Sequence, residues 1–393
     1  MQRLFIHAIL LVSSVFLLNS CFRDNEPEFS YEWIDYQELQ GNVTGSAVAA
    51  LGNRIIVGTE DGIQYFTVGS NAQWTHSNLR GIHITALFVH PFIQNLVIAT
   101  TDPNASTNTN TNPFPIYRST DSGATWTGVQ TGLKIEGSTV VPTIQSISWK
   151  LIEEAQIGRQ YADMYVSVSG SGVARSRDDG VTWQLIKGSI SADNTTKCHV
   201  NVMQSFYTDL YLGCEEPGNQ TFVEIIDLNQ DNYQTLPAAN RFVTTSQLGQ
   251  KAVVGLKPSY FTPGLSYGLL KGGLIAIVKN EFRWVFDYST AGGQALNTTL
   301  TTFWINPSDL NDLVFGGYEN TDNNTFSLYS TPDHGKTFKL IEPPSFMNLS
   351  SPKIMGSFET GLSAQNLMLL VSGKNAQGQT KTRVMSRNQV SSN

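Results

Sequence analysis

Residues 116–126 read IYRSTDSGATW, residues 173–183 read VARSRDDGVTW, and residues 328–338 read LYSTPDHGKTF. The three stretches share one pattern: Ser or Thr, any residue, Asp, any residue, Gly, any residue, Thr and an aromatic residue. An Asp side chain can accept hydrogen bonds from nearby backbone N–H groups, and a Gly two positions later allows a positive φ. The pattern therefore predicts a locked turn, after which Thr and the aromatic residue begin a new strand.

This pattern resembles the Asp box of sialidases and related β-propellers, also called the bacterial neuraminidase repeat. The resemblance implies that the boxes lie in outer turns, remote from the ligand face, and act in folding. A structural role is thus expected for Ser119, Asp121, Gly123, Trp126, Ser176, Asp178, Gly180, Trp183, Thr331, Asp333, Gly335 and Phe338.

The spacing of the boxes sets the size of the repeat. Asp121 and Asp178 are 57 positions apart, and Asp178 and Asp333 are 155 apart, which is about three units of 52. Dividing residues 21–393 by this repeat gives about seven units. We therefore predict an all-β fold: a single β-propeller of seven four-stranded blades.

The two ends of the chain fit a ring that closes on itself. Residues 383–386 match the strand that enters a box, but no fourth strand follows before the chain stops. Residues 31–36 form an aromatic-led strand that no other blade claims. We predict that this N-terminal strand joins the last blade and covers its exposed edge.

The first twenty residues predict export. Arg3 precedes an apolar run at 4–18, which is too short to span a bilayer comfortably and is followed by Cys21. Residues 18–21 (LNSC) resemble the lipobox of bacterial lipoproteins, whose cysteine is acylated; an ordinary cleaved signal is the alternative. We expect a signal peptide at 1–20, a lipid-attached tether at 21–29 and a propeller at 30–393. The implied location is the cell envelope membrane, preferably the outer membrane or cell surface.

Composition narrows the range of partners. The net charge is −7, and no basic stretch offers a surface for nucleic acid. The six histidines have no metal-ligand spacing, so we predict neither a metal nor a cofactor.

In an exported chain Cys198 and Cys214 could pair across neighbouring strands, or a tight turn could set them out of register. We expect a monomer.

Loops between the second and third strands lie on the face opposite the boxes, where propellers that resemble this one bind ligands. Several of these predicted loops are acidic and aromatic. Such a rim could stack a sugar or dock a protein, or reflect plain loop polarity. The candidate binding residues are Tyr260, Phe261, Tyr267, Glu215, Glu216, Tyr318 and Glu319.

Catalysis needs residues that this sequence does not visibly bring together. A sialidase clamps its substrate with three convergent arginines and uses a Tyr paired with an acid. Here Arg118, Arg175 and Arg383 precede box positions, away from the central face. We therefore predict no catalytic residue and a binding or assembly scaffold for a protein or glycan, as in the photosystem II assembly factors and sortilin-type receptors that the chain resembles. The alternative is a hydrolase of sialidase-like or other glycosidase type.

Overall fold

The computed structural model is described for these residues: 30–69, 73–105, 114–134, 141–154, 159–168, 172–187, 199–206, 209–216, 220–228, 241–243, 253–258, 265–270, 273–278, 281–287, 298–305, 313–319, 326–331, 338–359 and 366–390. Within them the chain forms seven four-stranded antiparallel sheets and one short 3-10 helix, η2 (Ser345–Met347). No helix in this part of the chain has the length and hydrophobicity needed to cross a membrane.

Six blades use four consecutive strands each. Blade 1 holds β2 (Gly45–Leu51), β3 (Arg54–Thr59), β4 (Gly62–Thr67) and β5 (Thr75–Arg80); blade 2 holds β6 (His83–Val89), β7 (Val97–Asp102), β8 (Ile116–Ser119) and β9 (Thr127–Gly128); blade 3 holds β10 (Ile144–Glu154), β11 (Arg159–Val168), β12 (Gly172–Ser176) and β13 (Gln184–Lys187). Blade 4 holds β14 (His199–Phe206), β15 (Asp209–Glu216), β16 (Gln220–Asp227) and β17 (Arg241–Val243); blade 5 holds β18 (Val253–Pro258), β19 (Leu265–Leu270), β20 (Gly273–Val278) and β21 (Glu281–Asp287); blade 6 holds β22 (Thr298–Ile305), β23 (Leu313–Glu319), β24 (Phe326–Thr331) and β25 (Lys339–Leu340).

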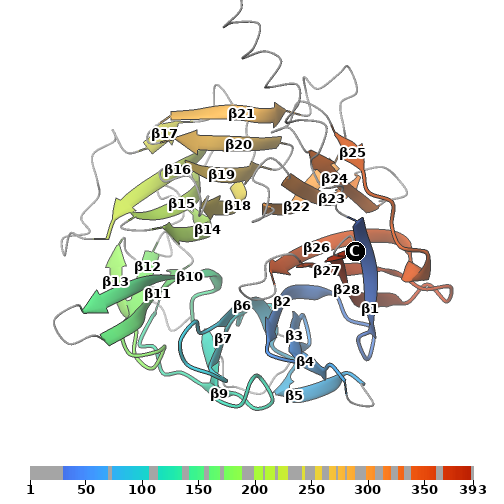
Figure 1. Ribbon diagram of the computed structural model, residues 1–393. Helices are drawn as coiled ribbons and strands as arrows, with labels where there is room; N and C mark the ends of the chain where they lie inside the picture. Colours follow the sequence, from blue (N-terminus) through green and yellow to red (C-terminus); the bar gives the residue numbers. More distant parts are fainter. Residues whose placement is uncertain are drawn as a thin grey trace, which may run out of the picture.

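The seventh blade joins the two ends of the chain. Strands β26 (Ser350–Glu359), β27 (Asn366–Lys374) and β28 (Thr380–Val390) are followed in space by β1 (Ser30–Glu38). First strands of neighbouring blades contact one another in a closed cycle that ends with β26 against β2. The blades therefore surround one axis (Figure 1), and the predicted all-β propeller of seven blades, closed by the N-terminal strand, is confirmed.

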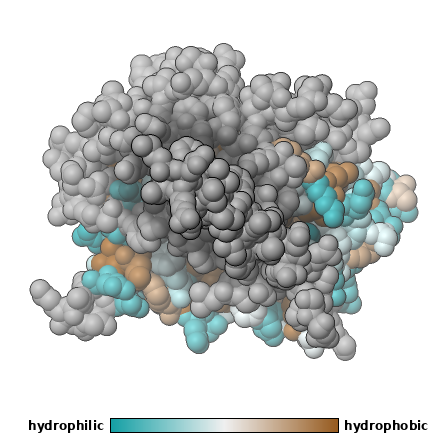
Figure 2. Space-filling model, turned by 45° about the horizontal axis from the view of Figure 1, so that its top comes forward, coloured by the Kyte–Doolittle hydropathy of each residue, from teal (hydrophilic) through white to brown (hydrophobic). Residues whose placement is uncertain are grey.

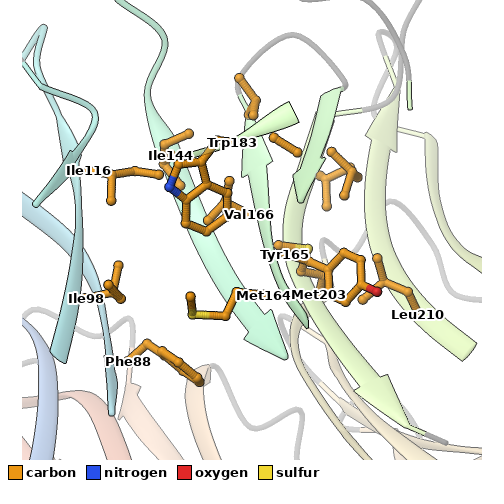
Figure 3. Close-up of a cluster of buried hydrophobic side chains, with 14 of the residues drawn as sticks. Phe88, Ile98, Ile116, Ile144, Met164, Tyr165, Val166, Trp183, Met203 and Leu210 are labelled. Carbon is orange, nitrogen blue, oxygen red and sulfur yellow. The ribbon is translucent and has the colours of Figure 1, made fainter. Parts of the chain in front are cut away.

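The core lies between the blades. Second strands are buried almost throughout, as in β3 and β7, because a neighbouring sheet covers each of their faces. Figure 3 shows this alternation in blade 3: Met164 points toward Ile98 of blade 2, and the next residue, Tyr165, points toward Leu210 of blade 4. Adjacent side chains of one strand thus seal two different interfaces.

Every first strand carries a β-bulge at the same place. In each of the seven blades, the pairing between the first and second strands shifts by one residue at an equivalent position in the first strand. A bulge leaves one residue unpaired and bends the strand. The unpaired residues, which we call the bulge residues, are Ser46, Thr85, Gln145, Asn201, Val254, Thr301 and Met355.

Bulge hydroxyls link neighbouring blades. Ser46 Oγ donates to the carbonyl of Ile84, the residue before the bulge in blade 2, and Thr85 Oγ1 donates to the equivalent carbonyl of Ile144 in blade 3. Thr301 Oγ1 donates to the Ile354 carbonyl of blade 7 at 2.6 Å. The same hydrogen bond thus recurs at three junctions between blades and satisfies a backbone carbonyl at each.

The two complete repeat turns have the same hydrogen bonds. Asp121 Oδ1 accepts from Thr125 N at 2.9 Å and Ser119 Oγ at 2.8 Å, and its Oδ2 accepts from Thr125 Oγ1 at 2.6 Å. Trp126 Nε1 donates to the Gly123 carbonyl at 2.9 Å. In blade 3, Asp178 accepts from Thr182 N, Ser176 Oγ and Thr182 Oγ1, and Trp183 Nε1 donates to the Gly180 carbonyl.

Glycine in these turns is required by both conformation and space. Gly123 has a φ of 83° and Gly180 a φ of 81°, in the region that side chains disfavour. A Cβ on Gly123 would lie 2.8 Å from Ile56 Cδ1 of blade 1, and one on Gly180 2.8 Å from Ile98 Cδ1 of blade 2. Each turn therefore packs closely against the preceding blade.

The third repeat is only partly described. Thr331 is fully buried, whereas Asp333 and Gly335 lie outside the described residues. Phe338 is 38% exposed and packs edge-on against Phe315, with 5.8 Å between ring centroids. Trp126 and Trp183, by contrast, are buried at 4% and 7% exposure.

Arg383 holds the closing strand in place. It lies in β28 and is 12% exposed; Nη1 donates to Asp35 at 2.9 Å and Nη2 to Glu38 at 3.1 Å, both in β1. Nη1 also donates to the Phe346 carbonyl at 2.9 Å. One cation therefore joins β1, β28 and the segment before β26.

We predict that Arg383→Met destabilises the ring by about 2 kcal/mol, because it leaves two half-buried carboxylates and a carbonyl without this donor. Urea unfolding followed by tryptophan fluorescence measures the change. Lys374→Met, which removes an exposed cation from the adjacent strand, is the control and should shift stability by about 0.5 kcal/mol or less. Equal unfolding midpoints for the two variants would contradict this role.

We predict that Asp121→Asn and Asp178→Asn each cost about 1 kcal/mol at neutral pH, because an amide replaces a charged acceptor. Burial raises the pKa of both carboxyls, but hydrogen bonds from the neighbouring Thr and Ser outweigh it, and the net pKa is below its usual value. A lowered folded-state pKa stabilises above the unfolded value, about 3.9, and this stabilisation is lost as pH falls through the folded value. The stability gap between wild type and variants should therefore close in acid; a gap independent of pH would contradict the assignment.

Candidate functional site

The two ends of the ring differ in what they present. Turns from first to second strands and from third to fourth strands lie at one end, which we call the turn face. In blade 2, for example, Val97 at the start of β7 pairs with Ser119 at the end of β8, so the turns next to both residues lie at the same end. Turns from second to third strands, and the connections between blades, lie at the other end, which we call the loop face. First strands begin at the loop face, so the bulges lie near that end.

The candidate site is the mouth of the ring at the loop face. Five of the seven bulge residues, all but Val254 and Met355, carry groups that can form hydrogen bonds. Gln145 is exposed, and Ser46, Thr85, Asn201 and Thr301 are half-buried. Gln145 and Asn201 contribute amide groups to this end of the ring. The hydroxyls of Ser46, Thr85 and Thr301 donate to carbonyls of the next blade and keep their acceptor lone pairs.

A second set of polar residues lies two positions before the bulge residue in blades 1, 2, 3, 6 and 7. It contains Thr44, His83, Thr143, Thr299 and Lys353. Thr143 Oγ1 donates to Asp102 Oδ1 at 2.7 Å, and the same oxygen accepts from Asn104 N at 3.0 Å. Thr44 N donates to Glu60 Oε1 at 3.2 Å. Acidic groups thus border the mouth on blades 1 and 2.

A cation and an aromatic ring border the mouth on the other side. Lys353 Nζ of blade 7 lies 4.6 Å from the ring centroid of Tyr318 of blade 6, a cation–π contact between neighbouring blades. Both side chains are half-buried. The mouth therefore combines hydroxyls and amides with charges of both signs, an arrangement suited to a polar ligand or a peptide.

Four of the predicted binding residues lie at the loop face, and two lie outside the described part of the chain. Tyr318 lies at the loop face beneath Lys353, and the backbones of Glu319, Glu215 and Glu216 also end strands at this face. Tyr260 and Phe261 lie outside the described residues.

The prediction that Tyr267 belongs to an exposed aromatic rim is wrong. It lies inside β19 and is 4% exposed, packed with Leu269 and Phe303. Its alternation with Leu269 along the strand was the signal that pointed to the core rather than to a loop.

The three arginines considered for a sialidase lie apart. Arg118, Arg175 and Arg383 belong to the third strands of blades 2, 3 and 7. Arg118 Nε donates to the Asp179 carbonyl of the next blade at 3.0 Å, and Arg383 binds β1. These guanidinium groups join parts of the ring rather than meeting at the mouth.

Cys214 is buried and disulfide-bonded, whereas Cys198 and Cys21 lie outside the described residues. Among the described residues, no three His, Cys, Asp or Glu side chains gather as a metal site would require.

Sequence reasoning missed the bulge ring. In each first strand the bulge residue follows an apolar residue or Gly and usually precedes a small residue, a pattern too general to mark a bulge before the strand pairing is known. The triplets centred on the bulge residues are Gly45-Ser46-Ala47, Ile84-Thr85-Ala86, Ile144-Gln145-Ser146, Val200-Asn201-Val202, Val253-Val254-Gly255, Leu300-Thr301-Thr302 and Ile354-Met355-Gly356.

No protein-family model matches this chain, and no curated protein matches its sequence. Solved structures do match. The chain shares its fold with YCF48. For YCF48 bound to D1 peptide the TM-score is 0.56 at 11% identity, covering 90% of this chain and 96% of that one; for YCF48 from Cyanidioschyzon merolae the values are 0.54, 11%, 91% and 98%. An ancestral GH74 enzyme is also similar, with a TM-score of 0.53 at 12% identity over 89% of this chain and 47% of that one. At such identities the similarity establishes the fold alone.

One buried carboxyl group has a perturbed pKa. Asp163, in β11 near the turn face, is 3% exposed, with Arg177 Nε 3.6 Å from Oδ2 and the Tyr165 hydroxyl 3.5 Å from the same oxygen. Burial raises the pKa of Asp163 above its usual value, although Arg175 and Arg177 oppose the shift.

We predict that Asp163→Asn stabilises the protein at neutral pH by about 1 kcal/mol, because the amide avoids burying a charge that only the largely exposed Arg177 offsets. A raised folded-state pKa favours folding below the unfolded value and loses that contribution as pH rises through the folded value, so the buried carboxylate is costly at pH 7. Melting temperatures from pH 3 to 8 measure the effect. The two proteins should converge in acid; a variant less stable at pH 7 would mean that the ion pair with Arg177 dominates.

Proposed function

We propose that this chain is a membrane-anchored lipoprotein whose Asp-box propeller acts as a non-catalytic scaffold. It binds a protein or glycan partner at the mouth of the ring on the loop face. The observation that carries the proposal is the ring of bulge residues, which presents polar, half-buried groups around one axis on rigid strands. A preorganised polar frame of this kind favours recognition because few side chains must be ordered on binding.

Three further observations support it. Residues 1–21 combine Arg3, an apolar run and Cys21 in the manner of an acylated export signal. The repeat turns of blades 2 and 3 are locked by Asp, Ser and Thr in the way the Asp-box pattern leads one to expect. A solved structure of similar fold, YCF48, holds a D1 peptide, so a propeller of this shape can serve as a peptide-binding scaffold.

We predict that Gln145→Arg reduces capture of the partner about tenfold, because a bulky charge enters the mouth where an exposed amide now lies. The measurement is affinity capture by tagged full-length chain from detergent extracts of the native membrane, quantified by mass spectrometry. Lys339→Glu changes an exposed charge on the turn face and is the matched control, so its captured set should equal that of wild type.

Two results would contradict the proposal. Equal capture by Gln145→Arg and wild type would place binding elsewhere on the molecule. Release of reducing sugars from cell-envelope polysaccharides by wild type, lost in Gln145→Arg, would favour the hydrolase instead.

A further inference from the structure

Exposed apolar side chains gather at one end of the ring. Among the described residues, the large hydrophobic side chains that are more than a third exposed all lie at the turn face or within a few residues of it. They are Val68, Phe92, Ile93, Leu151, Val181, Phe338 and Leu340. Brown hydrophobic groups reach the surface between teal hydrophilic ones in the coloured part of the view in Figure 2.

The densest group spans blades 2 and 3. Phe92 and Ile93 lie in the turn between β6 and β7, and Phe92 packs edge-on against Trp149 of blade 3 at 5.8 Å. Leu151 lies two residues beyond Trp149 on β10, past the level at which β12 ends. We call Phe92, Ile93, Leu151 and Val181 the apolar patch.

His90 fixes the patch in position. Its Nδ1 accepts from the backbone N–H groups of Phe92 at 3.2 Å and Ile93 at 2.9 Å. Its Nε2 lies 3.3 Å from Asp179 Oδ1, in the turn that also carries Val181. The two turns are thereby held together while their apolar side chains remain outward. Sustained exposure of a rigid apolar group indicates a surface that is covered in use.

Charges near the patch are of both signs. Arg177 has a side chain 55% exposed, and Asp121 and Glu153 are exposed as well. A strongly charged partner surface would therefore gain little net attraction here. The combination of exposed apolar side chains with charges of both signs fits the interfacial region of a bilayer better. There the apolar side chains are buried shallowly and the charged ones lie among the lipid headgroups.

The position of the N-terminus identifies the occupant. Ser30 pairs with Val390 at the turn-face end of blade 7, so the residue to which the tether is joined lies at the turn face. The eight residues between Cys21 and Ser30 can span about 30 Å at most. The nine residues of β1 span about 30 Å between the turn face and the loop face. A fully extended tether is about as long as this distance, so it is too short to let the loop face rest on the membrane that holds Cys21.

We propose that the turn face docks on the lipid surface to which Cys21 is attached, with the apolar patch inserted shallowly and the mouth of the ring directed away from the membrane. The inference rests on the lipid anchor of the proposed function. An acyl anchor alone leaves the propeller free to rotate on the membrane, whereas an anchor at one edge and a patch at the other set its orientation. Tethering also raises the effective concentration of the patch at the bilayer, which favours its insertion.

The test uses residues 22–393 with an N-terminal histidine tag, held on vesicles of phosphatidylethanolamine and phosphatidylglycerol that contain a nickel-chelating lipid. Val181→Cys and, as the matched control, Gln377→Cys on the exposed loop-face turn between β27 and β28 each carry an environment-sensitive fluorophore. We expect the Val181 label to shift to the blue and to be quenched by doxyl lipids, and the Gln377 label to stay in water. Water exposure of both labels, or quenching of the Gln377 label, overturns the proposal.

A second measurement removes the patch. The triple variant Phe92→Ser, Ile93→Ser, Val181→Ser should bind vesicles that lack the nickel-chelating lipid about tenfold more weakly than wild type. It should still unfold cooperatively, with a melting temperature lowered by the lost contact between Phe92 and Trp149. If the Val181 label is instead shielded without vesicles and sedimentation shows a dimer, the patch joins two copies and the proposal fails. Native acylation is read separately from the mass of the N-terminal peptide, so loss of the anchor and failure of the docking face are distinguished.

Discussion

Closure of the ring is the constraint on which the rest of the structure depends. Each second strand is buried on both faces, so every blade needs a neighbour on each side, and a linear stack would expose two such faces at its ends. The chain meets this demand with two devices. Bulge hydroxyls such as those of Ser46 and Thr85 link consecutive first strands near the axis, and Arg383 holds β1 as the last strand of blade 7.

The sequence predicts the parts of this architecture that are local. A repeat turn is decided within eight residues, so Asp121 and Asp178 could be recognised from spacing alone, and their separation gave the blade size. Closure by residues 31–36 followed from counting strands, since an unpaired strand at each end has only one partner available. Blade number and strand order therefore needed no knowledge of tertiary contacts.

Features that depend on neighbouring blades escaped prediction. The bulge ring is defined by pairing shifts, and its triplets differ in chemistry from Gly45-Ser46-Ala47 to Ile354-Met355-Gly356, so no residue type marks it. Tyr267 was assigned to a loop because prolines and aromatics precede it, but contact with Phe303 of the next blade buries it. Nothing in the sequence marks Asp163, and only the surrounding packing shows that burial raises the pKa of its carboxyl.

Strand direction gives the ring its polarity. All seven first strands run the same way, so their bulges gather at one end and the repeat turns at the other. Strand β1 acts as a fourth strand and must run from the turn face to the loop face, as β5 does in blade 1. Ser30, the first described residue, therefore lies at the same end of the ring as the repeat turns. The topology that closes the ring therefore puts Ser30 and the bulge residues at opposite ends of the same propeller, separated by the length of a strand.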